Sequence, residues 1–390
     1  MKAETRAVLA LGLGQTMAWG GSYYIPAILA APMARDLGVA TPVVFGVFSA
    51  ALLLAALVGP AAGRAIDRQG GQGVLVASNL VLALGLGLLG FAQGLASLVL
   101  AWGVMGLGMG MGLYESAFAS LARLFGKGAR GPITGITLMA GFASTIAWPL
   151  TTWLEAGYGW RGACLAWAVA MLVLGPLLNG VLLPRPAAPA EAKPGAAPAA
   201  SEAPPPGALV MGLLAFVFAV SGFGASALAA HLPGVLAAAG ATPAAVVAAA
   251  ALLGPAQVAA RLLEFGLLRR LDPVLNAMVA NTLPALGAAL LLGLGAPGAI
   301  AYAMLHGAGN GLLTIARGTL PLALFGPVGY GSRAGWLAIA TRFAGAAAPL
   351  LFGLAVEGWG AWALVITSAL YLGAAVALIC IRLMLGRTEN

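Results

Sequence analysis

Charged residues are scarce in this chain of 390 residues. Asp, Glu, Lys and Arg together make up 8% of the sequence, whereas a soluble domain carries about 25%. Hydrophobic residues make up 61%, and the mean hydropathy is +0.99. No soluble core buries so much apolar surface, so we expect an all-α integral membrane protein. The long apolar runs favour helices over the alternating strands of a β-barrel.

Cysteine and histidine are nearly absent, with two residues of each. Cys164 and Cys380 lie in separate apolar runs, which argues against a disulfide framework or a metal site. The sequence has no nucleophile triad and no nucleotide-binding loop, so we expect no enzymatic activity, no cofactor and no metal. We assign the net charge of +8 to loops facing anionic lipid, not to nucleic acid.

Twelve apolar runs are long enough to cross a bilayer as helices, which takes about 20 residues each. The predicted spans are 7–32, 42–62, 73–94, 98–122, 131–154, 161–183, 208–232, 243–267, 274–295, 298–322, 333–356 and 359–384. Residues 184–207 are rich in Pro and Ala, which predicts an extended linker. We therefore predict a six-helix bundle over residues 1–183, a cytoplasmic linker over 184–207, and a second six-helix bundle over 208–390.

The two halves share short motifs at an offset of 200 residues, which indicates pseudo-symmetric bundles. Leu124-Phe125-Gly126 recurs as Leu324-Phe325-Gly326, and Pro149-Leu150 recurs as Pro349-Leu350. Basic residues predict the orientation. With both termini in the cytoplasm, fourteen of the nineteen Lys and Arg residues fall in cytoplasmic segments: Lys2, Arg6, Arg64, Arg68, Arg123, Lys127, Arg130, Arg185, Lys193, Arg269, Arg270, Arg333, Arg382 and Arg387.

The segment GRAIDRQG follows the second predicted span and begins at Gly63. Its pattern of Gly63, Asp67, Arg68 and Gly70 resembles the loop between the second and third helices of major facilitator superfamily transporters. The chain departs from that pattern at Gly71 and Gln72, where the family usually has a basic pair. The resemblance implies two bundles that rock around a central site. It also implies that Asp67 and Arg68 form a gating latch, which we expect to close the cytoplasmic face against the tenth or eleventh helix.

Glu115 is the one acid within the first six predicted spans, and Tyr114 precedes it. A charge at the bilayer centre costs about 2.5–3.5 kcal/mol on the translocon scale, so the carboxylate needs a cation, a cavity or a proton. One hypothesis is that Glu115 couples transport to protons or contacts substrate, and Tyr114 beside it is a further candidate for the same site. The alternative is a structural ion pair.

Arg261, Arg317 and Arg342 lie within the eighth, tenth and eleventh predicted spans. An embedded guanidinium suits a carboxylate or another oxyanion, by charge and by its forked donors. The three arginines therefore favour an anionic solute. Glu264 lies three residues after Arg261, which predicts a local ion pair between them.

Four further polar residues are candidates for the pathway. Gln15 and Tyr23 belong to the first span, which lines the pathway in the family that the chain resembles. His306 and Asn310 lie four residues apart on one face of the tenth span. Polar packing between helices is the alternative for this pair, and an anchor at the membrane interface is the alternative for Tyr23.

These observations predict a secondary transporter in the bacterial inner membrane that works as a monomer. We expect it to move a small, anionic solute by alternating access, coupled to an ion gradient, with protons as the expected ion. Efflux of drugs or of metalloids such as arsenite is the alternative function. A membrane sensor without transport is a more remote one.

Overall fold

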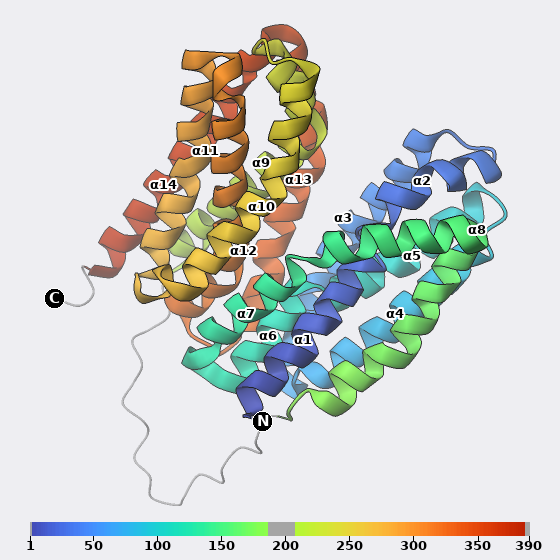
Figure 1. The fold of residues 1–390 in the computed structure, drawn as a ribbon. Helices are drawn as coiled ribbons and strands as arrows, with labels where there is room; N and C mark the ends of the chain where they lie inside the picture. The colour runs from blue at the N-terminus through green and yellow to red at the C-terminus, as the bar shows by residue number, and fades with distance from the viewer. Residues whose placement is uncertain (1, 186–206, 387–390) are drawn as a thin grey trace, which may run out of the picture.

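A computed structural model describes residues 2–185 and 207–386, and the regular elements of that part of the chain are helices (Figure 1). The first half contains α1 (Ala3–Gly20), α2 (Ile25–Asp36), α3 (Thr41–Gln69), α4 (Gly71–Gly90), α5 (Leu95–Gly112), α6 (Tyr114–Phe125), α7 (Arg130–Ala140) and α8 (Ala143–Pro176). The second half contains α9 (Ala208–Ala238), α10 (Pro243–Gly266), α11 (Pro273–Leu294), α12 (Ala299–Phe325), α13 (Tyr330–Trp359) and α14 (Leu364–Gly386). The predicted linker 184–207 lies almost entirely outside the described residues, so the division into domains stays a prediction.

Several membrane crossings are built from two helices, because the backbone breaks inside an apolar run. A turn at residues 21–24 separates α1 from α2, and Leu113 is extended (φ −78°, ψ −168°) between α5 and α6. In α8, Gly159 adopts φ 68° and joins two crossings. Seven segments of the described chain are apolar and long enough to span a membrane, and two of these, Leu95–Leu182 and Tyr330–Leu385, contain more than one crossing.

Two predicted boundaries are wrong. The segment predicted as a loop after the second span is helical, because α3 continues through Asp67 and Arg68 to Gln69. Gly70 ends it with φ 87°, a conformation that favours glycine. The seventh span was expected to end before Pro233, yet α9 runs through this proline to Ala238. Packing against neighbouring helices makes such a proline tolerable within a membrane helix.

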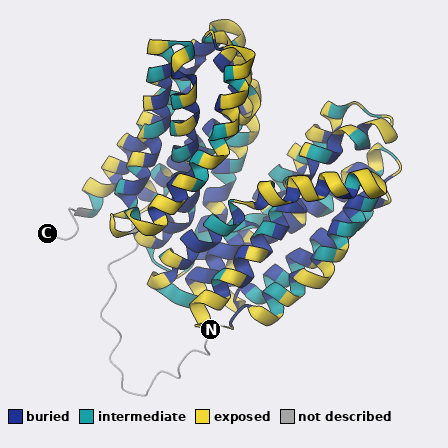
Figure 2. Cartoon of the chain, in the orientation of Figure 1, coloured by how far each residue is buried: buried dark blue, intermediate teal, exposed yellow. Residues whose placement is uncertain are grey.

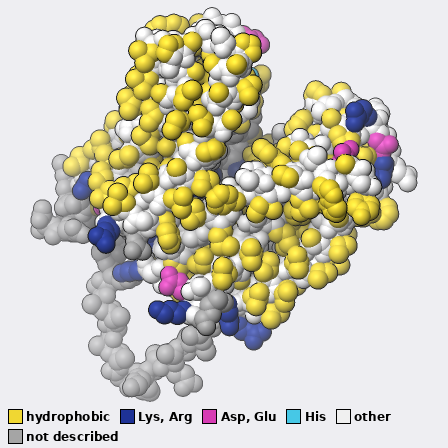
Figure 3. All heavy atoms as spheres, in the orientation of Figure 1, with side chains coloured by type: hydrophobic (Ala, Val, Ile, Leu, Met, Phe, Trp, Pro, Cys, Tyr) yellow, Lys and Arg dark blue, Asp and Glu magenta, His cyan; other side chains and the backbone are white. Residues whose placement is uncertain are grey.

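The helices form two bundles that meet at one end and diverge at the other (Figure 1). Helices α1–α8 form the N bundle, and α9–α14 form the C bundle. Buried residues line the inside of each bundle (Figure 2). Apolar side chains cover much of the outer surface, whereas many of the visible charged residues gather near the chain termini (Figure 3). We call the end where α1 begins and α14 ends the termini face.

The bundles touch each other near the termini face. One core cluster combines Ile66, Phe118 and Ile133 of the N bundle with Leu322 and Tyr330 of the C bundle. Figure 3 shows the two lobes separated at the opposite end. The described structure is therefore closed at the termini face.

The closed face depends on glycine where α3 crosses α13. A Cβ atom placed on Gly63 would lie 2.0 Å from the carbonyl oxygen of Gly331. One placed on Gly335 would lie 2.6 Å from Cα of Pro60. The atoms in the way are backbone atoms, so a side chain at either position forces the helices apart.

We predict that Gly63→Ala shifts the protein away from the state that is closed at the termini face. The added methyl group clashes with the backbone of Gly331, and overpacking of this kind costs about 1–3 kcal/mol. The closed population should fall, and the distance between the bundles at this face should increase.

Double electron–electron resonance measures that distance. The spin labels are attached at Arg123→Cys and Arg270→Cys, in a Cys380→Ser background. Gly46→Ala is the matched control on α3, because its added Cβ meets no heavy atom within 4 Å. An unchanged distance distribution in Gly63→Ala would contradict the role of the glycine contact.

Candidate functional site

An ion pair joins the two bundles deep between them. Arg342 on α13 donates from Nη2 to Oε2 of Glu115 on α6, at 3.1 Å. The break at Leu113 places Glu115 in the first turn of α6, near the point where the crossing is interrupted. The side chains are 25% (Glu115) and 17% (Arg342) exposed, so solvent reaches the pair. The structure therefore contains an ion pair, as the structural alternative predicted.

Arg261 also reaches across the interface. Its side chain on α10 is 6% exposed. It donates to the carbonyl oxygen of Thr137 on α7 at 3.2 Å and to Oγ1 of Thr314 on α12 at 3.5 Å. Its Nε is buried and has no hydrogen-bond partner among the described residues. The guanidinium thus keeps unused donor capacity at the interface.

The predicted local ion pair between Arg261 and Glu264 is wrong. Glu264 bonds instead to the N bundle, to Arg130 at 3.2 Å and to the Thr134 hydroxyl at 3.1 Å. Arg130 also donates to the carbonyl oxygen of Leu271 at 2.9 Å. Tertiary structure decides this pairing, because α7 places both a cation and a hydroxyl next to the Glu264 carboxylate.

Arg317 on α12 faces the same region. Its charge interacts with Glu115, Tyr114, Tyr23 and Arg261. Its buried Nε has no hydrogen-bond partner in the described part of the chain, and neither has Nη1 of Arg342. The structure therefore brings the three predicted arginines and Glu115 into one cluster, which we call the arginine cluster.

Aromatic rings of the N bundle lie next to the arginine cluster. Tyr23 and Tyr114 were predicted, and both lie near Arg317. Trp19 connects them, with ring centroids 5.0 Å from each. The rings that α3, α5 and α8 contribute were not predicted as site residues, because an aromatic residue in an apolar helix gives no sign of which face it occupies.

Gln15 has a structural contact in the described state. Its Nε2 donates to the carbonyl oxygen of Gly112 at 2.7 Å. In an unbroken helix that carbonyl would accept from the amide of Ser116, which bonds to Leu113 instead. Gln15 therefore satisfies a backbone group that the break between α5 and α6 leaves free.

His306 lies outside the arginine cluster. It is buried in the C bundle between the rings of Tyr302 and Tyr371, at centroid distances of 6.0 and 6.2 Å, which matches the packing alternative. Asn310 adjoins the cluster, because its backbone carbonyl accepts a hydrogen bond from Thr314, whose hydroxyl also accepts from Arg261. The role of the Asn310 side chain stays a prediction.

The GRAIDRQG segment contacts the eleventh crossing, as the predicted latch requires. The two carboxylate oxygens of Asp67 accept hydrogen bonds from the amides of Gly331 and Ser332, at 2.8 and 2.9 Å. These amides belong to the first turn of α13, whose N-cap residue Gly329 has no side chain to bond them. Asp67 therefore caps a helix of the other bundle. Arg68 is exposed at the end of α3.

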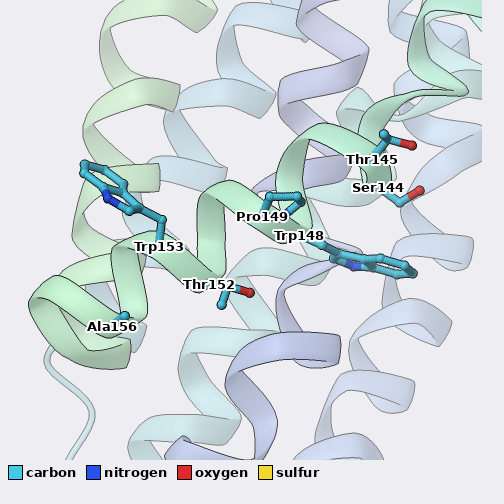
Figure 4. A pocket seen from close by; sticks show the side chains of 7 residues that line it. All are labelled: Ser144, Thr145, Trp148, Pro149, Thr152, Trp153 and Ala156. Carbon is cyan, nitrogen blue, oxygen red and sulfur yellow. The ribbon is translucent and has the colours of Figure 1, made fainter.

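A groove of about 700 Å³ lies along the first part of α8 (Figure 4). It is lined by Ser144, Thr145, Trp148, Pro149, Thr152, Trp153 and Ala156. Trp148 and Trp153 point to opposite sides of the helix in Figure 4. The groove contains none of the arginines, but Trp148 also contacts Tyr24, with ring centroids 5.9 Å apart. The groove therefore adjoins the aromatic rings beside the arginine cluster.

The described residues contain no group of three or more His, Cys, Asp or Glu side chains arranged to hold a metal ion. Cys164 is buried on α8, whereas Cys380 is exposed on α14. Two thiols on different bundles do not form a site for arsenite, so no observation favours the metalloid alternative.

Comparisons with known proteins agree with this architecture. The sequence profile of the Major Facilitator Superfamily matches residues 11–305. No curated protein sequence matches the chain. The structure resembles the human organic anion transporter MFSD10 (TETRAN), with 17% identity, a TM-score of 0.71, and coverage of 97% of this chain and 100% of the other.

It also resembles FucP, a Major Facilitator Superfamily transporter captured in the outward conformation, with 13% identity, a TM-score of 0.74, and coverage of 97% and 99%. A variant of the E. coli fucose:proton symporter FucP matches with 14% identity, a TM-score of 0.72 and the same coverage. At these identities the likeness concerns the fold alone, and it confirms the predicted all-α membrane architecture. The family profile covers most of the chain, which therefore belongs to the Major Facilitator Superfamily and is a multi-pass secondary transporter of a small solute.

Proposed function

We propose that this transporter binds a small anionic solute between its two bundles and couples its movement to protons. The observation that carries the proposal is the charge of the arginine cluster. Arg261, Arg317 and Arg342 converge from three helices of the C bundle, and Glu115 is the one acid that the described structure places among them. Positive charge in excess is costly away from water, and an anion that binds there removes the cost.

The proton part of the proposal rests on the ion pair. An ionised Glu115 occupies Arg342 and competes with the anion for it. A protonated Glu115 carries no charge and leaves Arg342 to the solute. The groups that face this carboxylate are Arg342 and Tyr330 from α13, Arg317 from α12, and Tyr114 of its own helix. Proton and anion would therefore bind together, which is the thermodynamic basis of symport.

We place both termini in the cytoplasm of a bacterium. Arg64, Arg123, Arg130 and Arg333 lie near the termini face, in line with the excess of basic residues expected on the cytoplasmic side. The described state is then closed to the cytoplasm and open to the outside. The proposed working unit is one chain, because both bundles that form the cluster belong to it.

Asp67 would serve as the latch of the cytoplasmic face. Its charge lies at the N-terminus of α13, where the helix dipole favours an anion. When the bundles rock, these two hydrogen bonds must break, because Asp67 and α13 belong to different bundles. Asp67 therefore contributes to the stability of the outward-open state without contacting the arginine cluster.

We predict that Glu115→Gln binds anions more tightly than the wild type and without pH dependence. The amide cannot ionise, so it no longer holds Arg342 by charge. Isothermal titration calorimetry in buffers of different ionisation enthalpy counts the protons taken up with each anion, using acetate, succinate and benzoate as probes. The wild type should take up about one proton per anion, and the variant close to none.

Glu357→Gln is the control for Glu115→Gln, because Glu357 is exposed at the end of α13. It should retain the wild-type proton uptake. If Glu115→Gln also retains it, Glu115 is not the coupling group.

We predict that Arg342→Gln weakens anion binding by about 10- to 100-fold, because a hydrogen bond to a charged group contributes about 1.5–3 kcal/mol. The double variant with Glu115→Gln keeps the local charge balance and separates this loss from the effect of an unpaired carboxylate. Arg382→Gln on the exposed side of α14 is the control. Equal affinity in Arg342→Gln and wild type would refute the anion site.

We predict that Asp67→Asn slows transport and leaves anion affinity within about twofold of wild type. Loss of the charged cap weakens the closed cytoplasmic face by about 0.5–2 kcal/mol. The matched control is Asp272→Asn, which changes a cap that bonds Val274 and Leu275 within one bundle. Uptake by proteoliposomes and binding in detergent separate the two effects, and lost binding in Asp67→Asn would contradict the latch.

A further inference from the structure

The N bundle presents a continuous set of aromatic rings, the aromatic wall, which the arginine cluster does not account for. It consists of Trp19, Tyr23, Tyr24, Phe48, Trp102, Tyr114, Phe118 and Trp148. The centroids of neighbouring rings are 5.0 to 6.0 Å apart. Phe48 and Trp102 extend the wall to α3 and α5, and Trp148 extends it to α8. Rings from α1, the turn at residues 21–24 and four further helices of the bundle thus meet in one place.

Part of the aromatic wall is exposed in the described structure. Tyr23 is 38% exposed and Trp148 is 43% exposed, although both lie within apolar crossings. Trp19, Tyr24 and Tyr114 are partly exposed. These five residues offer ring surface to a ligand, whereas Trp102 and Phe118 are buried behind them. Trp148 also lines the open groove on α8.

The accessible rings and the arginines lie near one another between the bundles. Tyr23 is near Arg317 and Arg342, and Tyr24 is near Arg261. The two chemistries are segregated, because the rings come from the N bundle and the guanidinium groups come from the C bundle. A ligand that contacts both bundles therefore meets ring faces on one side and cations on the other.

This segregation restricts the class of ligand. An inorganic oxyanion or a short aliphatic carboxylate would satisfy the arginines and leave the aromatic wall uncovered. A cation would suit the ring faces, yet three arginines oppose it. A planar aromatic ring bearing a carboxylate satisfies both sides, since the ring stacks on the wall and the carboxylate accepts from the guanidinium groups.

We propose that the substrate is an aromatic carboxylate, whose ring binds Tyr23, Tyr24 and Trp148 and whose carboxylate binds Arg317 and Arg342. This inference rests on the proposed anion transport and narrows it. Such a ligand bridges the bundles, so it favours their approach at the open face. It also supplies an acceptor for the donors of Arg317 and Arg342 that lack one in the described structure.

Binding to the full-length protein in detergent tests the inference, with calorimetry and four probes. Benzoate and indole-3-acetate are aromatic carboxylates, cyclohexanecarboxylate has the same charge and a saturated ring, and benzyl alcohol has a ring without charge. The two aromatic carboxylates should bind at least threefold more tightly than cyclohexanecarboxylate. Benzyl alcohol should bind most weakly.

Variants locate the effect. Tyr24→Leu and Trp148→Leu should each weaken benzoate binding roughly 2- to 10-fold, the range expected for loss of one aromatic contact. They should leave the affinity for cyclohexanecarboxylate nearly unchanged, which distinguishes lost stacking from a misfolded site. Trp362→Leu is the control, because Trp362 is an exposed indole of the C bundle.

The outcomes separate this inference from the proposed function. If cyclohexanecarboxylate binds as tightly as benzoate in wild type, the aromatic inference is wrong and anion transport stands. If benzyl alcohol binds as tightly as benzoate, both are wrong. Absence of binding by the two aromatic carboxylates also overturns the inference, as does equal loss of both carboxylates in Tyr24→Leu and Trp148→Leu.

Discussion

The cost of holding charge away from water governs how the two bundles meet. Three acids lie at or near the interface, and each bonds to the opposite bundle: Asp67 to the first turn of α13, Glu115 to Arg342, and Glu264 to Arg130. The sequence has only eleven acidic residues, so a large share of them bonds between the bundles. Each bond lowers the cost of a partly buried carboxylate only while the bundles are together. The closed face is therefore stabilised by interactions that the opposite state must replace.

Shape makes those interactions possible. Gly63, Gly331 and Gly335 let α3 and α13 approach until their backbones touch, and this proximity brings Asp67 within reach of α13. Small residues serve a similar purpose in membrane helices generally, since lipid gives helices little hydrophobic reason to associate. In this chain the glycine contact lies between the bundles, at a surface that a rocking transporter must separate. Tight packing and reversible separation are compatible here because the close contact involves only a few residues of each helix.

The two bundles contribute different chemistry to the space between them. Rings gather on the N bundle and arginines on the C bundle, with Glu115 as the acid that the described N bundle places against them. A solute that bonds to both sides couples its own binding to the relative position of the bundles. That coupling follows from geometry, because neither side alone satisfies a ligand that is both aromatic and anionic. In the proposed mechanism, protonation of Glu115 acts on the same cluster, so proton and solute would share one set of contacts.

Hydropathy determined the membrane class, the helical crossings and most of their boundaries. A helix satisfies its own backbone hydrogen bonds, which lipid cannot do. The sequence also identified Glu115 and the three arginines, since an embedded charge stands out in an apolar run. The partners were decided by tertiary structure: Arg261 has a carboxylate three residues away, yet Glu264 bonds to Arg130 across the interface. Tertiary structure likewise decided where the helix breaks at Leu113 and which rings form the aromatic wall. Local sequence specifies which groups are costly to bury, and only the folded chain specifies which groups compensate them.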